Sequence, residues 1–162
     1  MVALDRIRTN ANICSIEIAF KGISIPSVLE GWQPFYNSTF DDADFTQAYS
    51  TLSSLEFAEE KINNAAGPSY KQKVVFRFPA NDAQRTERIV LLEKIKFVKL
   101  NLTEGQSILI GRNDYNQNKL PEIGIKTNHH FCEVSIEALS ISPSGFVPSS
   151  NFGLPSLIPV QQ

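Results

Sequence analysis

The chain has 162 residues, 42% of them hydrophobic and 20% charged, and its formal net charge is −2 at pH 7. This is the composition of an ordinary globular domain that is long enough to bury its own core. A charge so near zero excludes the broad positive surface with which proteins bind nucleic acid or anionic membranes.

The sequence also carries no membrane signal. No apolar run reaches the roughly 18–20 residues that a membrane-spanning helix needs, and the first ten residues, MVALDRIRTN, lack the apolar stretch of a signal peptide. We therefore expect a protein made and kept in a reducing cytoplasm. There, Cys14 and Cys132 are expected to be buried thiols rather than a disulfide.

The first forty residues predict extended structure. In Asn12–Phe20, the apolar Ile16, Ile18 and Phe20 share one face, with polar residues between them, which is typical of a strand. A second short strand is expected at Lys21–Val28. The aromatic-rich Gly31–Phe40 is also expected to be extended.

The segment Asp41–Asn64 changes period. Its larger side chains recur every three or four residues, and its acidic residues lie at the start, where the N-terminus of a helix favours them. The spacing predicts a helix over at least part of this segment, closed by the turn at Gly67-Pro68.

The middle of the chain returns to alternation. Tyr70–Phe78 predicts a strand with Val74, Phe76 and Phe78 on its buried face. A short helix is expected next, capped by Asn81 and ending near Lys94. The remaining predicted strands are a hairpin formed by Lys96–Leu102 and Ser107–Gly111, and two closing strands within Leu120–Thr127 and Phe131–Ile141.

Together these elements predict a mainly β fold with one or two helices, of the α+β class. The expected form is a β-sandwich or barrel with a flanking helix. We expect a single β-rich domain over residues 1–141, with a helical insertion at about 41–64. A proline-rich extended arm follows over residues 142–162.

The arm is not composed like a linker. Four prolines and two glycines lie among recurring apolar residues, whereas a solvated linker would be polar. Composition does not decide whether the arm wraps its own domain or reaches a neighbouring molecule. Its candidate contact residues are Phe146, Phe152, Leu154 and Ile158.

The stretch ILIGRNDYNQNKLPEIGI, Ile108–Ile125, is the most specific part of the sequence. Asparagine, aspartate and glycine favour a turn after the first apolar run, and the loop is longer than most hairpin loops. Long loops often bind partners, and arginine and tyrosine are enriched at interfaces. A self-contained turn explains the pattern equally well. The candidate contact residues are Arg112, Asn113, Asp114 and Tyr115.

Signatures of catalysis and of metal binding are weak. His129, His130 and Cys132 lie close in sequence, and on a strand His130 and Cys132 would point to one face, as two zinc ligands might. A site needs three or four ligands, and beyond this group the sequence offers only the isolated Cys14 and scattered carboxylates. No Gly-x-Ser-x-Gly or glycine-rich phosphate loop occurs. The sequence therefore predicts no enzyme, no cofactor and no resident metal.

The order of elements over Asn12–Ile141, and the run from VVFRFP through KFVKLNL to ILIGRND, resemble the tail-tube and distal-tail proteins of bacteriophage tails and baseplates. The resemblance implies a non-enzymatic structural subunit of a virion, in a tail-tube, tail-completion or baseplate-adaptor role. It also implies ring-forming assembly with copies of the chain and with neighbouring tail proteins, through sheet edges and long loops.

An alternative is a β-sandwich module that binds carbohydrate or another small ligand. Exposed Trp32, Tyr36 and Tyr115 would then stack on a sugar, and the loop amides would bond to its hydroxyl groups. In the assembly interpretation, Trp32 and Phe35 are weaker contact candidates, because aromatic residues beside Pro34 can equally belong to the core.

Overall fold

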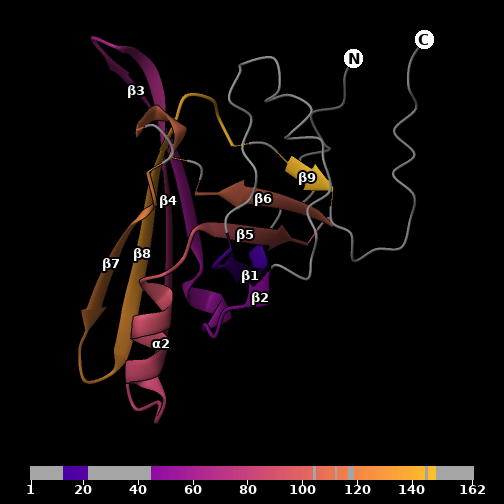
Figure 1. The fold of residues 1–162 in the computed structure, drawn as a ribbon. Helices are drawn as coiled ribbons and strands as arrows, with labels where there is room; N and C mark the ends of the chain where they lie inside the picture. The colour runs from indigo at the N-terminus through magenta and orange to yellow at the C-terminus, as the bar shows by residue number, and fades with distance from the viewer. Residues whose placement is uncertain are drawn as a thin grey trace.

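The computed structural model of the chain describes residues 13–21, 45–103, 105–111, 113–116, 119–144 and 146–148. These residues form two antiparallel sheets that lie against each other, with one α-helix beside them (Figure 1). The predicted fold class, mainly β with a flanking helix, is confirmed. Both sheets are open, so the sandwich form of that prediction applies and not the barrel.

Each sheet combines hairpins with strands from distant parts of the sequence. The five-stranded sheet has the order β2 (Thr46–Gln47), β1 (Ile13–Ala19), β5 (Phe97–Leu102), β6 (Gln106–Ile110) and β9 (Phe146–Pro148). The four-stranded sheet has the order β3 (Glu56–Asn64), β4 (Gly67–Pro79), β8 (Phe131–Ser140) and β7 (Glu122–Thr127). Every pair of neighbouring strands is antiparallel.

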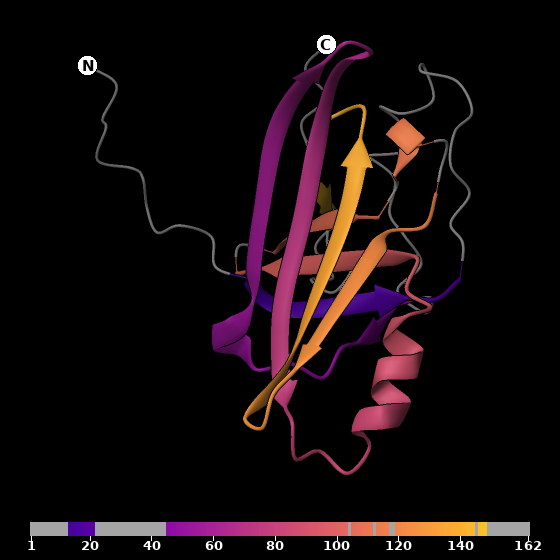
Figure 2. The same ribbon diagram turned by 90° about the vertical axis from the view of Figure 1, so that its left-hand side faces the viewer.

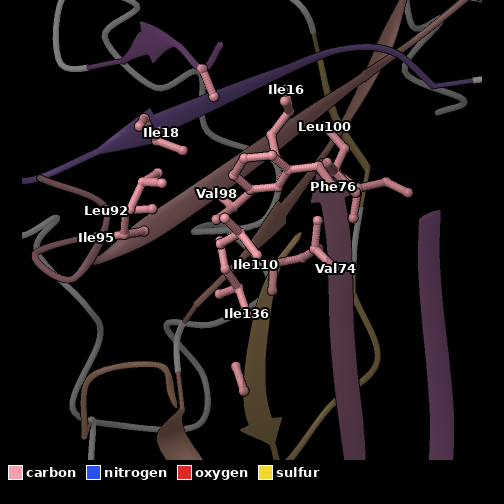
Figure 3. Packing of buried hydrophobic residues seen from close by; sticks show 14 of the residues in the cluster. Ile16, Ile18, Val74, Phe76, Leu92, Ile95, Val98, Leu100, Ile110 and Ile136 are labelled. Carbon is pink, nitrogen blue, oxygen red and sulfur yellow. The ribbon is translucent and has the colours of Figure 1, made fainter. Parts of the chain in front are cut away.

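The core lies between the two sheets. Strands of the five-stranded sheet run across those of the four-stranded sheet, as in sandwiches with steeply crossed layers (Figure 2). The Phe76 ring lies among aliphatic side chains from both sheets (Figure 3). The labelled core residues are Ile16, Ile18, Val74, Phe76, Leu92, Ile95, Val98, Leu100, Ile110 and Ile136.

Alternation predicted most strands of the described chain correctly. In β4, Val74 and Phe76 are fully buried, whereas Lys73 and Arg77 are exposed. The hairpin of β5 and β6 and the pair β7–β8 also form where the sequence predicted them. The second expected strand and the aromatic-rich segment after it lie outside the described residues, apart from Lys21.

The prediction of a helix within Asp41–Asn64 is wrong for the described part, residues 45–64. This part contains β2, a 3-10 turn at Leu52–Ser54 and the edge strand β3. All nine residues of β3 pair with β4, and those backbone hydrogen bonds outweigh a helical spacing of side chains. Gly67 does not close a helix: with φ +117° it ends the tight turn between β3 and β4.

The single α-helix of the described chain is α2, Arg85–Leu92, which lies below β1 and β5 in both ribbon views (Figures 1 and 2). It is shorter than predicted, and Asn81 does not cap it. Instead, Asp82 accepts a hydrogen bond from the Gln84 amide and forms an ion pair with Arg88, so this carboxylate holds the start of the helix.

The arm begins as a strand, although its sequence shows no strand pattern. β9 pairs with β6, with Phe146 opposite Ile108 and Pro148 opposite Gln106. This short part of the arm therefore docks on its own domain. The arm's other three candidate residues, Phe152, Leu154 and Ile158, lie outside the described residues.

The outer faces of the two sheets differ. On the five-stranded sheet, Phe97, Lys99, Ser107 and Leu109 alternate with core residues and are all buried as well. On the four-stranded sheet, the outer face carries charged residues that pair across the strands. The outer face of β5 and β6 is therefore buried, whereas the four-stranded sheet keeps one polar face.

Candidate functional site

The loop between β6 and β7 leaves the five-stranded sheet through a tight backbone contact. Gly111 has φ +118°, and a Cβ atom there would lie 2.5 Å from the Lys96 carbonyl oxygen. Asn113 follows with φ +43°, a left-handed conformation that asparagine tolerates better than most residues. The sequence thus provides glycine and asparagine at two loop positions whose backbone has positive φ.

Asn113 fixes the loop from inside. Its side chain is 2% exposed. Its amide nitrogen donates to the Leu120 carbonyl at 3.0 Å, and its side-chain oxygen accepts from the Leu139 amide at 2.9 Å. The same oxygen also accepts from the side-chain amide nitrogen of Asn116 at 3.2 Å. Asn113 therefore joins both ends of the loop to β8.

The next two residues attach the loop to other parts of the four-stranded sheet. Asp114 accepts a hydrogen bond from the Ile141 amide at 2.8 Å, just past the end of β8. The Tyr115 hydroxyl donates to the Asn64 side-chain oxygen at 3.1 Å, at the turn between β3 and β4. Together with Asn116 they form the 3-10 turn Asp114–Asn116.

A pocket of about 260 Å³ lies between this loop and the outer face of the four-stranded sheet. Its wall is mixed, with amide groups from the loop, charged groups from the strands and an aliphatic floor. Its lining residues are Ile62, Lys71, Asn113, Asn116, Glu122, Glu137, Ala138 and Leu139.

Glu137 dominates the electrostatics of the pocket wall. It lies between Lys71 and Lys73, with an N–O distance of 2.9 Å to each ammonium group. The hydrogen bond from Lys71, followed by that from Lys73, holds the pKa of Glu137 below its usual value. The hydrogen bond to Glu137 in turn raises the pKa of Lys71. Both groups are therefore charged at neutral pH.

A second, more apolar cavity of about 170 Å³ lies between the end of β1 and α2. Phe20, Phe78 and Leu91 are among its lining residues, and the Arg88 guanidinium lies 4.3 Å from the centre of the Tyr49 ring at its wall. It contains none of the candidate contact or metal-ligand residues that the sequence indicated.

The structure does not gather the zinc-ligand candidates. Cys132 is buried and contacts the Thr127 hydroxyl at 3.2 Å, whereas His129 and His130 are exposed in the turn before it. Cys14 is a free, exposed thiol, so the expectation that both cysteines are buried is wrong for Cys14. In the described part of the chain, no three His, Cys, Asp or Glu side chains form a metal-binding group.

Of the predicted loop residues, Asn113, Asp114 and Tyr115 come together at the pocket side of the four-stranded sheet, whereas Arg112 lies outside the described residues. The sequence analysis missed the strand residues of the pocket, Lys71, Glu122 and Glu137. Their signal was the charge on the polar face of each strand, but only the register of β4, β8 and β7 brings them together.

No protein-family model, curated protein or solved structure matches this chain. The resemblance to phage tail proteins therefore stays a prediction. None of the helices in the described part of the chain is long and apolar enough to span a membrane.

Proposed function

We propose that this chain is a non-catalytic structural subunit that assembles with copies of itself and with neighbouring proteins. The observation that carries the proposal is the loop between β6 and β7. Its left-handed Asn113 is held by hydrogen bonds to Leu120, Asn116 and Leu139. A loop that its own hydrogen bonds hold in one conformation suits a recognition surface, because it loses little conformational entropy on binding.

The loop residues then have distinct roles. Buried Asn113 gives the loop its shape, and Asp114 ties it to the end of β8, so neither side chain is the main contact surface. Half-buried Tyr115 offers a ring on the loop surface, and exposed Asn116 offers an amide at the pocket wall. Such pre-ordered polar and aromatic groups suit a protein interface, because little conformational entropy is lost on binding.

The narrower form of the proposal is a role in a phage tail, as tube, tail-completion protein or baseplate adaptor, with the virion as its location. The open sandwich with one flanking helix supports this only as an architecture, and a fold alone is a weak guide to function. The candidate arm residues Phe152, Leu154 and Ile158 belong to this form as contacts with neighbouring subunits.

Light scattering over a range of concentrations tests the proposal. We expect the full chain to form oligomers whose mass rises with concentration, and a chain that stays monomeric throughout would overturn self-assembly. A second sample should end at Ser149, so that β9 stays paired with the β6 edge. If both samples oligomerise equally, the arm beyond β9 is not the assembly element.

The pocket supports a second candidate function, binding of a small polar ligand such as a sugar. Its amides and charged groups could bond to hydroxyls, although its volume lies below the usual range for ligand sites. Tyr115 does not line it, and Trp32 and Tyr36 lie outside the described residues. Calorimetric titration with mono- and disaccharides, compared with an Asn116→Ala variant, tests this candidate: binding that the substitution abolishes would favour it.

A further inference from the structure

Within the described part of the chain, β7 is an edge strand with no strand on its outer side. Among the described strands it pairs only with β8. Its outward-facing residues Glu122, Gly124 and Lys126 are exposed, and the Glu122 side chain is 71% exposed. An exposed edge presents unpaired backbone groups, which are a template for another strand.

The direction of the free backbone groups follows from the hairpin. The Asn128 amide donates to the Phe131 carbonyl, so hydrogen-bonded pairs alternate down the ladder from that point. Glu122, Gly124 and Lys126 therefore direct their N–H and C=O groups toward β8, whereas Ile123 and Ile125 direct theirs away from it. A partner strand would bond to these two isoleucines.

The sequence of β7 is complementary to itself. In an antiparallel pair of two copies centred on Gly124, Ile123 lies opposite Ile125, and Glu122 lies opposite Lys126, on both sides of the axis. Moving the centre to Ile123 or to Ile125 keeps the hydrogen-bonding pattern but leaves Glu122 or Lys126 opposite glycine. Only the register centred on Gly124 makes both charge pairs.

Local packing favours this register. Glu122 is exposed and forms an ion pair with Lys119 at 3.2 Å, and an incoming Lys126 would place a second positive group opposite it. Gly124 would face Gly124 of the second copy in a non-hydrogen-bonded pair, where backbones approach closely. The other edge strand of the same sheet, β3, carries three glutamates and one lysine, and this excess of negative charge disfavours pairing with a second copy. We call it the guarded edge.

We propose that two copies of this chain join through an antiparallel β7–β7 pair around a two-fold axis at Gly124, which makes one continuous sheet from their four-stranded sheets. This inference rests on the proposed self-assembly and names one of its contacts. Because the contact is isologous, it makes a dimer, and any larger ring would need a second interface.

Charge reversal tests the pairing. Glu122→Lys places lysine opposite lysine at both ends of the pair, and Lys126→Glu places glutamate opposite glutamate. By sedimentation velocity of the full chain, each variant alone should raise the dimer dissociation constant by about tenfold or more. An equimolar mixture of the two variants should restore the parent value within about threefold, because every cross-strand pair is again attractive.

Matched controls lie on the guarded edge. Glu60→Lys and Lys61→Glu change the net charge by the same amounts at exposed positions of β3. They should leave the dissociation constant within about twofold of the parent value, as expected for surface charges away from the contact. Equal urea midpoints for all variants would show that folding is unchanged.

The outcomes separate the two proposals. A parent chain that is monomeric at every concentration overturns both the β7 pair and self-assembly. A parent chain that dimerises but is unaffected by the β7 variants, or whose mixed variants bind no better than each alone, overturns the β7 pair and leaves self-assembly standing. Loss in the single variants with recovery in the mixture is the result expected for the pair.

A disulfide trap checks the register. In a Cys14→Ser background, chains with Glu122→Cys and chains with Lys126→Cys are mixed and oxidised. Opposite residues of a non-hydrogen-bonded pair lie about 4.5 Å apart at Cα, within the disulfide range. We expect the mixed dimer to form faster than either like dimer, because residue 122 lies opposite residue 126 in this register. Cys132 is buried and does not compete. Equal rates for all three dimers would overturn the register.

Discussion

In the five-stranded sheet, the outer face of β5 and β6 is buried, whereas the outer face of the four-stranded sheet is exposed and charged. The difference is visible in the sequence of each strand. In β5, residues from Phe97 to Leu100 are all buried, as in strands covered on both sides. In β8, buried residues alternate strictly with half-buried ones. Both sheets contribute to the core, and the four-stranded sheet also carries the loop contacts, the pocket and the β7 edge.

The largest expected loss of stability comes from a substitution in the core that the two sheets share. Phe76 is 0% exposed between the two sheets, so Phe76→Ala should lower the free energy of unfolding by about 3–5 kcal/mol. The control is Val75→Ala, on the outer face of the same strand, which should cost less than about 1 kcal/mol. Urea unfolding measures both. Equal losses would show that the two faces of β4 are not energetically different.

The second-largest expected effect is a difference in the stability lost when a lysine is replaced on each outer face. Lys99 is buried on the five-stranded sheet and pairs with Glu17 at 2.5 Å, so Lys99→Met leaves a partly buried carboxylate without its partner. We expect a loss of about 2–4 kcal/mol. Lys73→Met on the open sheet should cost about 0.5 kcal/mol, because Lys71 remains beside Glu137.

A double variant completes that test. Glu17→Gln combined with Lys99→Met removes both charges, and it should recover at least half of the stability lost in Lys99→Met alone. No recovery would mean that the lysine acts through packing, for instance against the Phe45 ring, which lies 4.8 Å from its ammonium group.

The loop that connects the two sheets should be intermediate. Asn113→Ala removes the acceptor for the Leu139 amide and places alanine at positive φ, so we expect a loss of about 2–3 kcal/mol by urea unfolding. Asn113→Gly keeps the conformation but not the hydrogen bonds, and should lose about 1 kcal/mol less. If the alanine variant is as stable as the parent, the loop is not held through Asn113.

The smallest effect is the pH dependence of the open face. Hydrogen bonds from Lys71 and Lys73 lower the pKa of Glu137 in the folded chain, so the unfolded chain binds its proton more readily. The contribution of Glu137 to stability is therefore present above the usual carboxyl range, and it is lost as the pH falls through the lowered pKa.

In Glu137→Gln this part of the acid dependence should disappear, with a loss of about 0.5–1 kcal/mol at pH 7. Urea midpoints between pH 3 and 7 measure it. Parallel curves for the parent and the variant would contradict the expected linkage.

Much of the sandwich was predictable, because its strands alternate in burial. Phe76 and its neighbours in β4 were assigned correctly from side-chain period alone. The helix expected around Leu55 and Ile62 failed because an edge strand needs few apolar residues once its partner supplies the hydrogen bonds. β9 was not predicted, because a strand of three residues is too short to show an alternating pattern of apolar and polar residues.

The site was predictable only in part. The sequence showed an amide-rich loop with turn residues. Whether Asn113 shapes the loop or contacts a partner depends on its burial, which the sequence does not show. The self-complementary order around Gly124 was present in the sequence as well. This order matters for pairing only because β7 is an edge strand, and the sheet topology determines which strand lies at the edge.

The long-range pairing of β1 has a consequence for synthesis. Ile18 pairs with Val98, about 80 residues later, whereas β3, β5 and β7 each pair with the strand that follows them. At about 5–20 residues per second, β1 leaves the ribosome roughly 4–16 seconds before its partner strand exists. During that interval β1 can pair only with the two-residue strand β2, so most of it stays unpaired and open to chaperones until β5 is made.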